Sequence, residues 1–208
     1  MRTDDCFTKE KYREMYHFSE RQCKGLRAMA ESIIEADKKI VVDIKTTGNN
    51  SKRDEILKLS IIDTDGNILY DGFFKPERDY HKDYKYLSKA TGIVPEQIAN
   101  APTLSEQLYI IDKILFSANT IIGYSLGTIM SFFRESGCVW RTDYDFISIE
   151  TAFELENDGK KNAALDDCAA YFDYHWSSDP PHNTLENCRA ALHCYKKMLE
   201  SGYELDMI

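Results

Sequence analysis

The sequence has few of the features that mark a secreted or membrane-bound protein. Its six cysteines include no C-x-x-C pair, and no signal peptide is visible. A chain of 208 residues is long enough to bury a core without a disulfide framework, so we expect free thiols in a reducing cytoplasm. No apolar run reaches the length of a membrane span, so no membrane association is predicted.

Basic side chains are in the minority. Lys and Arg total 26 against 35 for Asp and Glu, which gives a formal net charge of −9. Broad, sequence-blind binding of nucleic acid depends on Lys and Arg contacts to phosphates, and this balance disfavours it. A small pocket that holds one nucleotide end is compatible with the same charge.

The most informative stretch is an apolar run that ends in polar residues. Residues 38–48 read KKIVVDIKTTG, which predicts a strand that leaves a hydrophobic core and breaks at Gly48. Because side chains two apart on a strand share a face, Asp43 and Lys45 should lie on the same side of the sheet, about 6–7 Å apart along the chain. Lys45 is the unusual member, since a second carboxylate would suit this position.

The remaining pattern indicates one α/β domain. Residues 55–63 and 67–74 read as strands joined at Asp65-Gly66, and short strands are expected at 119–123 and 144–149. Helices are expected at 127–134, 163–174 and 184–200, the last capped by Asn183, and another opens at Pro102-Thr103. Residues 76–89 read as a charged connection, and residues 1–37 as an N-terminal helical extension with a helix at 20–36. The domain is expected to span residues 38–208.

Three stretches resemble, in order, the motifs of the ribonuclease H-like 3′–5′ exonucleases of the DnaQ-like (DEDDh) family. Residues 40–48 are similar to its apolar strand ending Asp-x-Glu-Thr-Thr-Gly. Residues 121–133 are similar to Gly-His/Tyr-Asn-x-x-Phe-Asp, and residues 182–190 to His-x-Ala-x-x-Asp. The resemblance covers about residues 38–201. It implies a ribonuclease H-like three-layer domain with a mixed β-sheet flanked by helices.

The resemblance also implies a catalytic apparatus. In the family, four carboxylates hold two divalent metals and a histidine acts as general base. Asp43 matches the first carboxylate and His182 matches the base. The other three metal-binding positions fall on Lys45, Ile129 and Asn187, none of which is a carboxylate. Asp43 is therefore at most a single metal ligand, and no cofactor is predicted.

Other registers of the motifs do not restore the carboxylates. A shift of the second motif by one residue places Thr128 at the acid position. A competing third motif gives Asp167 as the acid, with Asn162 in place of the histidine. We prefer the register with His182, because residues 165–172 match the helix that precedes the third motif in the family.

The substrate side of the resemblance is better preserved. Thr46, Thr47 and Gly48 match the segment that lies against the terminal nucleotide in the family. Lys45, by contrast, places an ammonium where a metal cation normally binds, and it can neutralise Asp43 without metal. Too few oxygen ligands are left for Mg²⁺.

We therefore predict a pseudo-enzyme of the exonuclease family, which binds a single-stranded nucleic-acid 3′ end or a protein partner. One alternative is an active exonuclease that holds Mg²⁺ or Mn²⁺ through non-standard ligands. A second alternative is a protein-interaction scaffold that does not bind nucleic acid, which the net charge favours. The non-standard ligands for an active enzyme would be drawn from Asp63, Asp65, Asp166 and Asp167.

Overall fold

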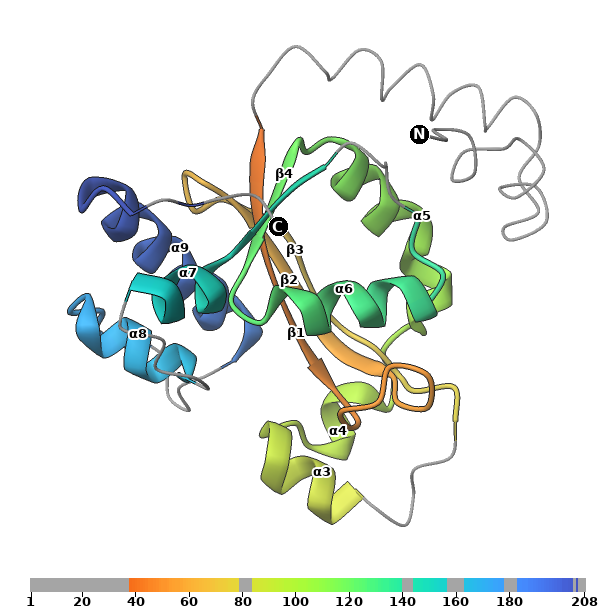
Figure 1. Ribbon diagram of the computed structural model, residues 1–208. Coiled ribbons are helices and arrows are strands. Elements are labelled where there is room, and N and C mark those ends of the chain that lie inside the picture. Colours follow the sequence, from red (N-terminus) through yellow and green to blue (C-terminus); the bar gives the residue numbers. More distant parts are fainter. Residues whose placement is uncertain are drawn as a thin grey trace.

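A five-stranded mixed β-sheet with helices on both faces forms the centre of the molecule (Figure 1). The computed structural model describes residues 38–78, 84–139, 144–156, 163–177, 183–203 and 205. The strand order is β3-β2-β1-β4-β5, which places β1 in the middle of the sheet. The α/β, mixed-sheet architecture expected from the sequence is confirmed.

The first three strands form an antiparallel unit, to which two parallel strands are added. β1 (Lys39–Thr46) pairs with β2 (Ile56–Asp63), which pairs with β3 (Ile68–Phe73). On its other side β1 pairs in parallel with β4 (Thr120–Gly123), and β4 pairs in parallel with β5 (Asp145–Ser148). All five strands overlap those expected from the sequence.

The hairpin between β2 and β3 follows the predicted turn. Gly66 has φ of +88°, a left-handed conformation that favours glycine, and its N–H bonds to the Asp63 carbonyl at 3.1 Å. The Asp63 carboxylate accepts hydrogen bonds from the backbone N–H groups of Asp65 and Asn67. The turn is therefore held by its own side chains.

Alternation along β1 divides the core between the two faces of the sheet. Ile40 and Val42 pack into one cluster with side chains of α5 (Leu104–Phe116) and α6 (Leu126–Glu135). Val41 packs into a second cluster with the helices of the other face. These are α7 (Ile149–Glu156), α8 (Leu165–Tyr171) and α9 (Thr184–Glu200), which lie together on one side of the sheet in Figure 1.

The helix starts at Thr103 and Asn183 are as expected. The Thr103 hydroxyl accepts from the Glu106 N–H, and the Glu106 carboxylate accepts from the Thr103 N–H. The Asn183 side chain accepts from the Glu186 N–H at 2.9 Å. Both caps satisfy N–H groups that lack a partner within the helix.

Two helices differ from the sequence-based expectation. α3 (Tyr84–Thr91) occupies the end of the stretch predicted as a connection, and its chain leaves at Gly92, which has φ of +71°. α3 has only eight residues, fewer than the roughly 11–18 over which a helical period is read, and it follows a charged, aromatic stretch. α7 begins at Ile149, where a strand was expected to end, because β5 is short and the chain turns there.

Two sequence-based predictions concern residues that the structure does not describe. The N-terminal extension with its helix at 20–36, and His182, lie outside the described residues. A short helix, α4 (Pro95–Ile98), follows α3 near the carboxyl end of β1, where the two helices sit together in Figure 1. No helix among the described residues is both long and apolar enough to cross a bilayer.

Candidate functional site

Asp43 and Asn187 meet on the face of the sheet that α9 covers. Asp43 lies on β1, opposite Ser60 of β2, and α9 packs across both strands. The side-chain amide of Asn187 donates to Oδ2 of Asp43 at 3.0 Å, although 144 residues separate them. The fold thus brings Asp43, from the first motif, into contact with Asn187, which is the last acid position of the third motif in the register that includes His182. Asp167 instead accepts from the Ala164 N–H at the start of α8.

The environment of Asp43 disfavours its charged form. Burial raises the pKa of its carboxyl to about 7 from an ordinary value of 3.8. The hydrogen bond from Asn187 and the positive charge of Lys45 act in the opposite direction but do not cancel the effect of burial. The carboxyl is thus held by a few polar groups that do not offset the loss of hydration.

Lys45 shares the face of Asp43, but its ammonium is hydrogen-bonded elsewhere. Its Nζ donates to the Thr91 carbonyl, at the end of α3, at 2.5 Å. Burial lowers the pKa of Lys45, the charge of Asp43 raises it, and the charge of Lys58 lowers it further. Lys45 therefore influences Asp43 through space, while its direct contact is with a neutral carbonyl.

A chain of polar contacts beside Asp43 joins α9 to the sheet. Ser60 Oγ donates to Oδ1 of Asp71 at 2.7 Å and shares a 2.6 Å hydrogen bond with the Thr184 hydroxyl. Lys58 Nζ lies 3.3 Å from the same Asp71 oxygen. Ser60 and Thr184 are fully buried, so these bonds hold the first turn of α9 against β2. Asn187, one turn further on, is positioned by this attachment.

Sequence reasoning missed this chain of contacts, although β2 contained a signal. Lys58 and Ser60 are the polar residues within an otherwise apolar strand before Asp63, and both are buried. Buried polar side chains need partners, so their alternation on one face of β2 indicated a polar counterpart on whatever packs there.

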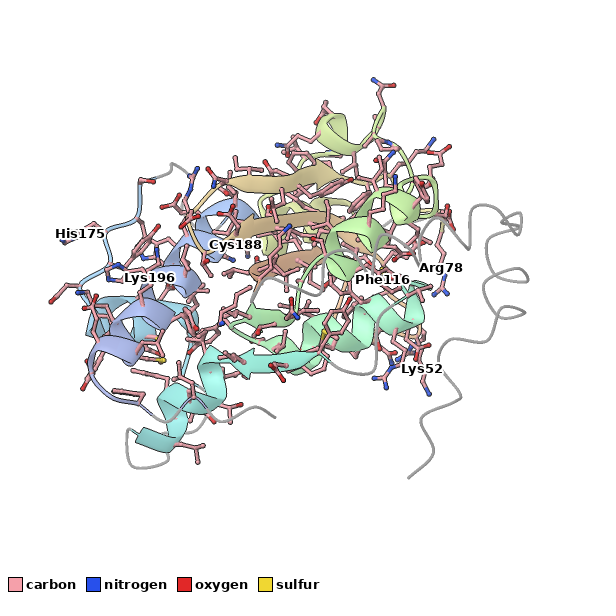
Figure 2. All side chains as sticks on the ribbon, turned by 90° about the horizontal axis from the view of Figure 1, so that it is seen from above. Lys52, Arg78, Phe116, His175, Cys188 and Lys196 are labelled. Atoms are coloured by element: carbon pink, nitrogen blue, oxygen red, sulfur yellow. The ribbon has the colours of Figure 1, made fainter. Side chains whose placement is uncertain are left out.

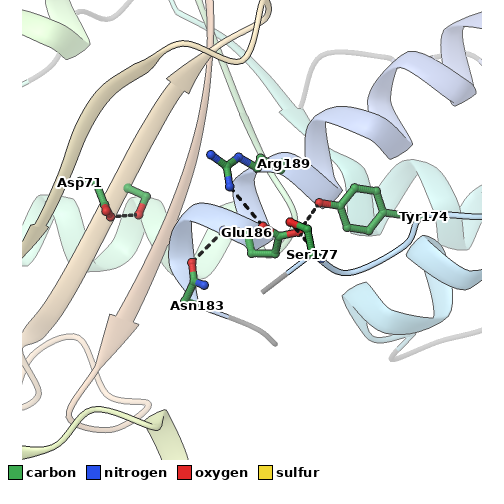
Figure 3. A network of polar contacts seen from close by, with 7 residues as sticks. Asp71, Tyr174, Ser177, Asn183, Glu186 and Arg189 are labelled. Atoms are coloured by element: carbon green, nitrogen blue, oxygen red, sulfur yellow. Dashed lines mark hydrogen bonds and ion pairs between the residues drawn. The ribbon is translucent and has the colours of Figure 1, made fainter. Parts of the chain in front are cut away.

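A second buried network fixes the start of α9 from the other side. Glu186 is fully buried and accepts hydrogen bonds from the Tyr174 hydroxyl at 2.7 Å and from Ser177. Arg189 Nη1 lies 3.3 Å from its other carboxylate oxygen, and Figure 3 shows these partners converging on Glu186. Burial alone would raise the pKa of Glu186, but these hydrogen bonds outweigh it and lower the pKa.

The three predicted substrate-binding residues form the turn after β1. Thr46 Oγ1 donates to the Gly48 carbonyl at 2.7 Å, and Thr47 Oγ1 accepts from the Glu55 N–H at 2.9 Å. A Cβ on Gly48 would lie 2.5 Å from Oδ2 of Asp54, so only glycine permits this close approach. The turn borders a cavity of about 260 Å³, which is lined by Ile44, Lys45, Thr46, Thr47, Gly48, Asn49, Ala90 and Thr91.

Ile129 lies away from this site. It is 2% exposed and packs in the cluster that contains Val42, whereas Asp43 follows Val42 on the strand and points to the opposite face. Its neighbour Thr128 is exposed. Leu126, Ile129 and Phe133 form one apolar stripe of α6 at helical spacing, which was a readable signal that Ile129 belongs to the core.

The residues present do not fit the two-metal centre that the fold family implies. A divalent metal needs several hard oxygen ligands, but Asn187 aims an N–H donor at Asp43, and Lys45 brings an ammonium. Within the described ranges, no group of three or more His, Cys, Asp or Glu side chains could hold a metal ion. Asp63 is engaged in its hairpin, and Asp167 caps α8.

A second cavity, of about 280 Å³, lies at the carboxyl end of β3 beside α5. Glu55 accepts from the backbone N–H groups of Glu77 and Arg78, while the Arg78 guanidinium donates to the carbonyls of Arg53 and Lys52. Figure 2 places Lys52 and Arg78 together, far from Cys188 on the α9 side. These charged side chains bond to backbone groups of neighbouring segments, so the region is a structural junction.

A family model and solved structures of known proteins both match this chain, and both are of exonucleases. The model of the RNase_T exonuclease family matches residues 40–193, which is most of the chain. No curated protein sequence matches.

Several solved structures share the fold. A 3′-exonuclease described for 3′-end specific recognition of a histone mRNA stem-loop has a TM-score of 0.64 and 14% identity, covering 90% of this chain and 74% of its own. The nuclease domain of 3′hExo, a DEDDh family member bound to rAMP, has a TM-score of 0.59 and 15% identity, covering 84% and 97%. Exonuclease X in complex with 5′ overhanging duplex DNA has a TM-score of 0.55 and 15% identity, covering 81% and 96%.

Proposed function

The chain belongs to the RNase_T exonuclease family, and from this premise we propose that it binds the 3′ end of a single nucleic-acid strand with two-metal nuclease activity lost or nearly lost. The observation that carries the proposal is the hydrogen bond from Asn187 to Asp43. It puts a donor on the oxygen that a metal would need, in a site where Lys45 already supplies positive charge.

Loss of the metals removes the main sources of rate in this chemistry. In two-metal hydrolysis the ions generate the nucleophile and stabilise the leaving oxygen. A general base at His182 has little to act on without an activated water. The expected residual rate is therefore small even if a strand end is held in the correct place.

Binding of a strand end is supported by the part of the site that is kept. Thr46, Thr47 and Gly48 line part of a cavity that Lys45 also lines, and their turn is held by internal hydrogen bonds. One structural neighbour is described as recognising a 3′ end, and another as holding 5′ overhanging duplex DNA. The net charge of −9 limits contacts along a long strand and favours a small, local site.

The activity test uses the full chain and a 5′-labelled single strand with Mg²⁺, with Mn²⁺, or with a chelator. We expect no metal-dependent shortening from the 3′ end. Asp43→Ala, purified in parallel, controls for contaminating nuclease. Metal-dependent shortening that Asp43→Ala lacks would overturn the proposal and favour an active enzyme with non-standard ligands.

The binding test compares linear strands with a closed circle of the same length and sequence. End binding predicts affinity for the linear strand, loss of affinity for the circle, and loss when the 3′ end is placed in a duplex. Absence of binding to all of these would leave the protein-interaction scaffold, which the acidic composition favours.

A further inference from the structure

Two lysines sit side by side on the strands next to Asp43. Lys45 of β1 and Lys58 of β2 are cross-strand partners, so their side chains leave the same face of the sheet. They differ in what they contact. Lys58 is an ion-pair partner of Asp71 at 3.3 Å, and its ammonium lies 4.6 Å from the centre of the Phe73 ring. Its charge is therefore already compensated.

Lys45 is compensated much less directly. Its hydrogen bond goes to the neutral carbonyl of Thr91, and among the described residues no carboxylate lies within ion-pair distance of its ammonium. An ammonium has three N–H donors, so two remain after the bond to Thr91. That bond also holds the long, flexible side chain in one place, which reduces the entropy lost when a ligand binds.

Lys45 borders a cavity that could accept an anion. Lys45 lines the same 260 Å³ space as the turn of Thr46, Thr47 and Gly48, and Thr91, which accepts its hydrogen bond, also lines it. The hydroxyls of both threonines are engaged within the turn, so among the described residues that line this cavity Lys45 is the charged one. A fixed cation in a polar cavity binds anions, and a phosphate accepts strong, charge-assisted hydrogen bonds from lysine.

The position of Lys45 gives this cation a specific meaning. By the resemblance, Lys45 stands at the second carboxylate position of the first motif. A positively charged side chain therefore lies where a carboxylate would bind a metal cation. We propose that Lys45 holds a phosphate of the bound strand end in place of a divalent metal, so that binding needs no metal. This inference rests on the proposed function, and it adds the group that is recognised and the cation that recognises it.

The experiment measures the affinity of a labelled single strand for the full chain, in excess chelator and in Mg²⁺, over a range of salt concentrations. For the wild type we expect affinities that agree within about twofold with and without Mg²⁺. Loss of one charge-assisted hydrogen bond should weaken binding of Lys45→Met about tenfold or more. The salt dependence should also become shallower by about 0.7 in the slope of log K against log salt, because one phosphate contact is lost.

Three further variants make the result specific. Lys89→Met removes the same charge from an exposed position on α3, two residues before Thr91, and should bind as the wild type does. Lys45→Arg keeps the charge and should retain most of the affinity. Lys45→Gln keeps a donor for the Thr91 carbonyl without the charge, so it should lose affinity even if Lys45→Met fails to fold.

The outcomes separate this inference from the proposed function. If the wild type binds strand ends only with Mg²⁺, or if Lys45→Gln binds as tightly as Lys89→Met, the role of Lys45 is overturned while end binding stands. If the wild type binds no strand end under any condition, the proposed function is overturned, and the role of Lys45 with it.

Discussion

The side-chain amide of Asn187 donates a 3.0 Å hydrogen bond to the Asp43 carboxylate, which joins the two ends of the candidate site. The Asn187 carbonyl oxygen is buried and has no hydrogen-bond partner among the described residues. The Asn187 amide therefore acts mainly as a hydrogen-bond donor to the Asp43 carboxylate. This contact therefore joins β1 to α9 through an N–H donor and a carboxylate.

Asn187→Asp tests that relationship directly. Two carboxylates about 3 Å apart repel each other, so in chelator at pH 8 the free energy of unfolding of the variant should be about 1–3 kcal/mol lower than that of the wild type. Its unfolding temperature should fall accordingly. Mn²⁺ should recover part of this loss, because a cation between the carboxylates relieves the repulsion. Thermal unfolding with and without Mn²⁺ measures both effects. Asn187→Leu is the control, with no Mn²⁺ response expected, and an Asn187→Asp variant as stable as the wild type in chelator would mean that the two side chains are not adjacent.

Ile129→Asp should be strongly destabilising. The side chain is 2% exposed in an apolar cluster, and an unpaired buried carboxylate costs several kcal/mol. We expect a loss of about 3 kcal/mol or more in urea unfolding. Thr128→Asp, one residue earlier and exposed, should change stability by less than about 0.5 kcal/mol. Equal tolerance of both variants would place Ile129 at the surface of the site.

Gly48→Ala should damage the turn that borders the cavity. The new Cβ would lie 2.5 Å from an Asp54 oxygen that is already held by the Asn50 N–H, so the turn must shift. We expect a loss of about 1–3 kcal/mol and weaker strand binding. Gly127→Ala is the matched control: its Cβ meets nothing within 4 Å, and alanine in a helix should add about 0.5–1 kcal/mol. Unfolding curves that rank the two variants in the opposite order would contradict the loop geometry.

Glu186 should contribute stability that depends on pH. Its pKa is lowered from the usual 4.5 in the folded state, so its ionised form stabilises the fold above that value, and the contribution is lost as the pH falls through the folded-state pKa. Glu186→Gln should therefore cost about 1–3 kcal/mol at pH 7, with a difference that shrinks as the pH falls below 4.5. Urea unfolding across this range checks the trend. Exposed Glu96→Gln should show no such pattern, and a Glu186→Gln penalty independent of pH would exclude the ionised network as its cause.

The elements of the fold were largely readable from local patterns. Alternation placed Asp43 and Lys45 on one face of β1, the turn at Gly66 set the hairpin, and Thr103 and Asn183 capped the helices that they precede. These features depend on residues close in sequence, where backbone geometry and side-chain period leave few choices. α3 was missed because its eight residues are fewer than the window over which a helical period can be read.

The partners of the polar residues on β1 are decided by contacts between segments that are distant in the sequence. The sequence by itself determined the strand and helix patterns around these residues, and its resemblance to the family motifs predicts that Lys45 and Asn187 stand at carboxylate positions. Tertiary packing decided that Lys45 bonds to Thr91, 46 residues away, that Asn187 reaches Asp43, and that Ile129 belongs to the opposite layer. The reason is physical: a hydrogen-bond partner is chosen by which surfaces pack together, here α9 across β1 and β2, and that packing is a property of the whole core.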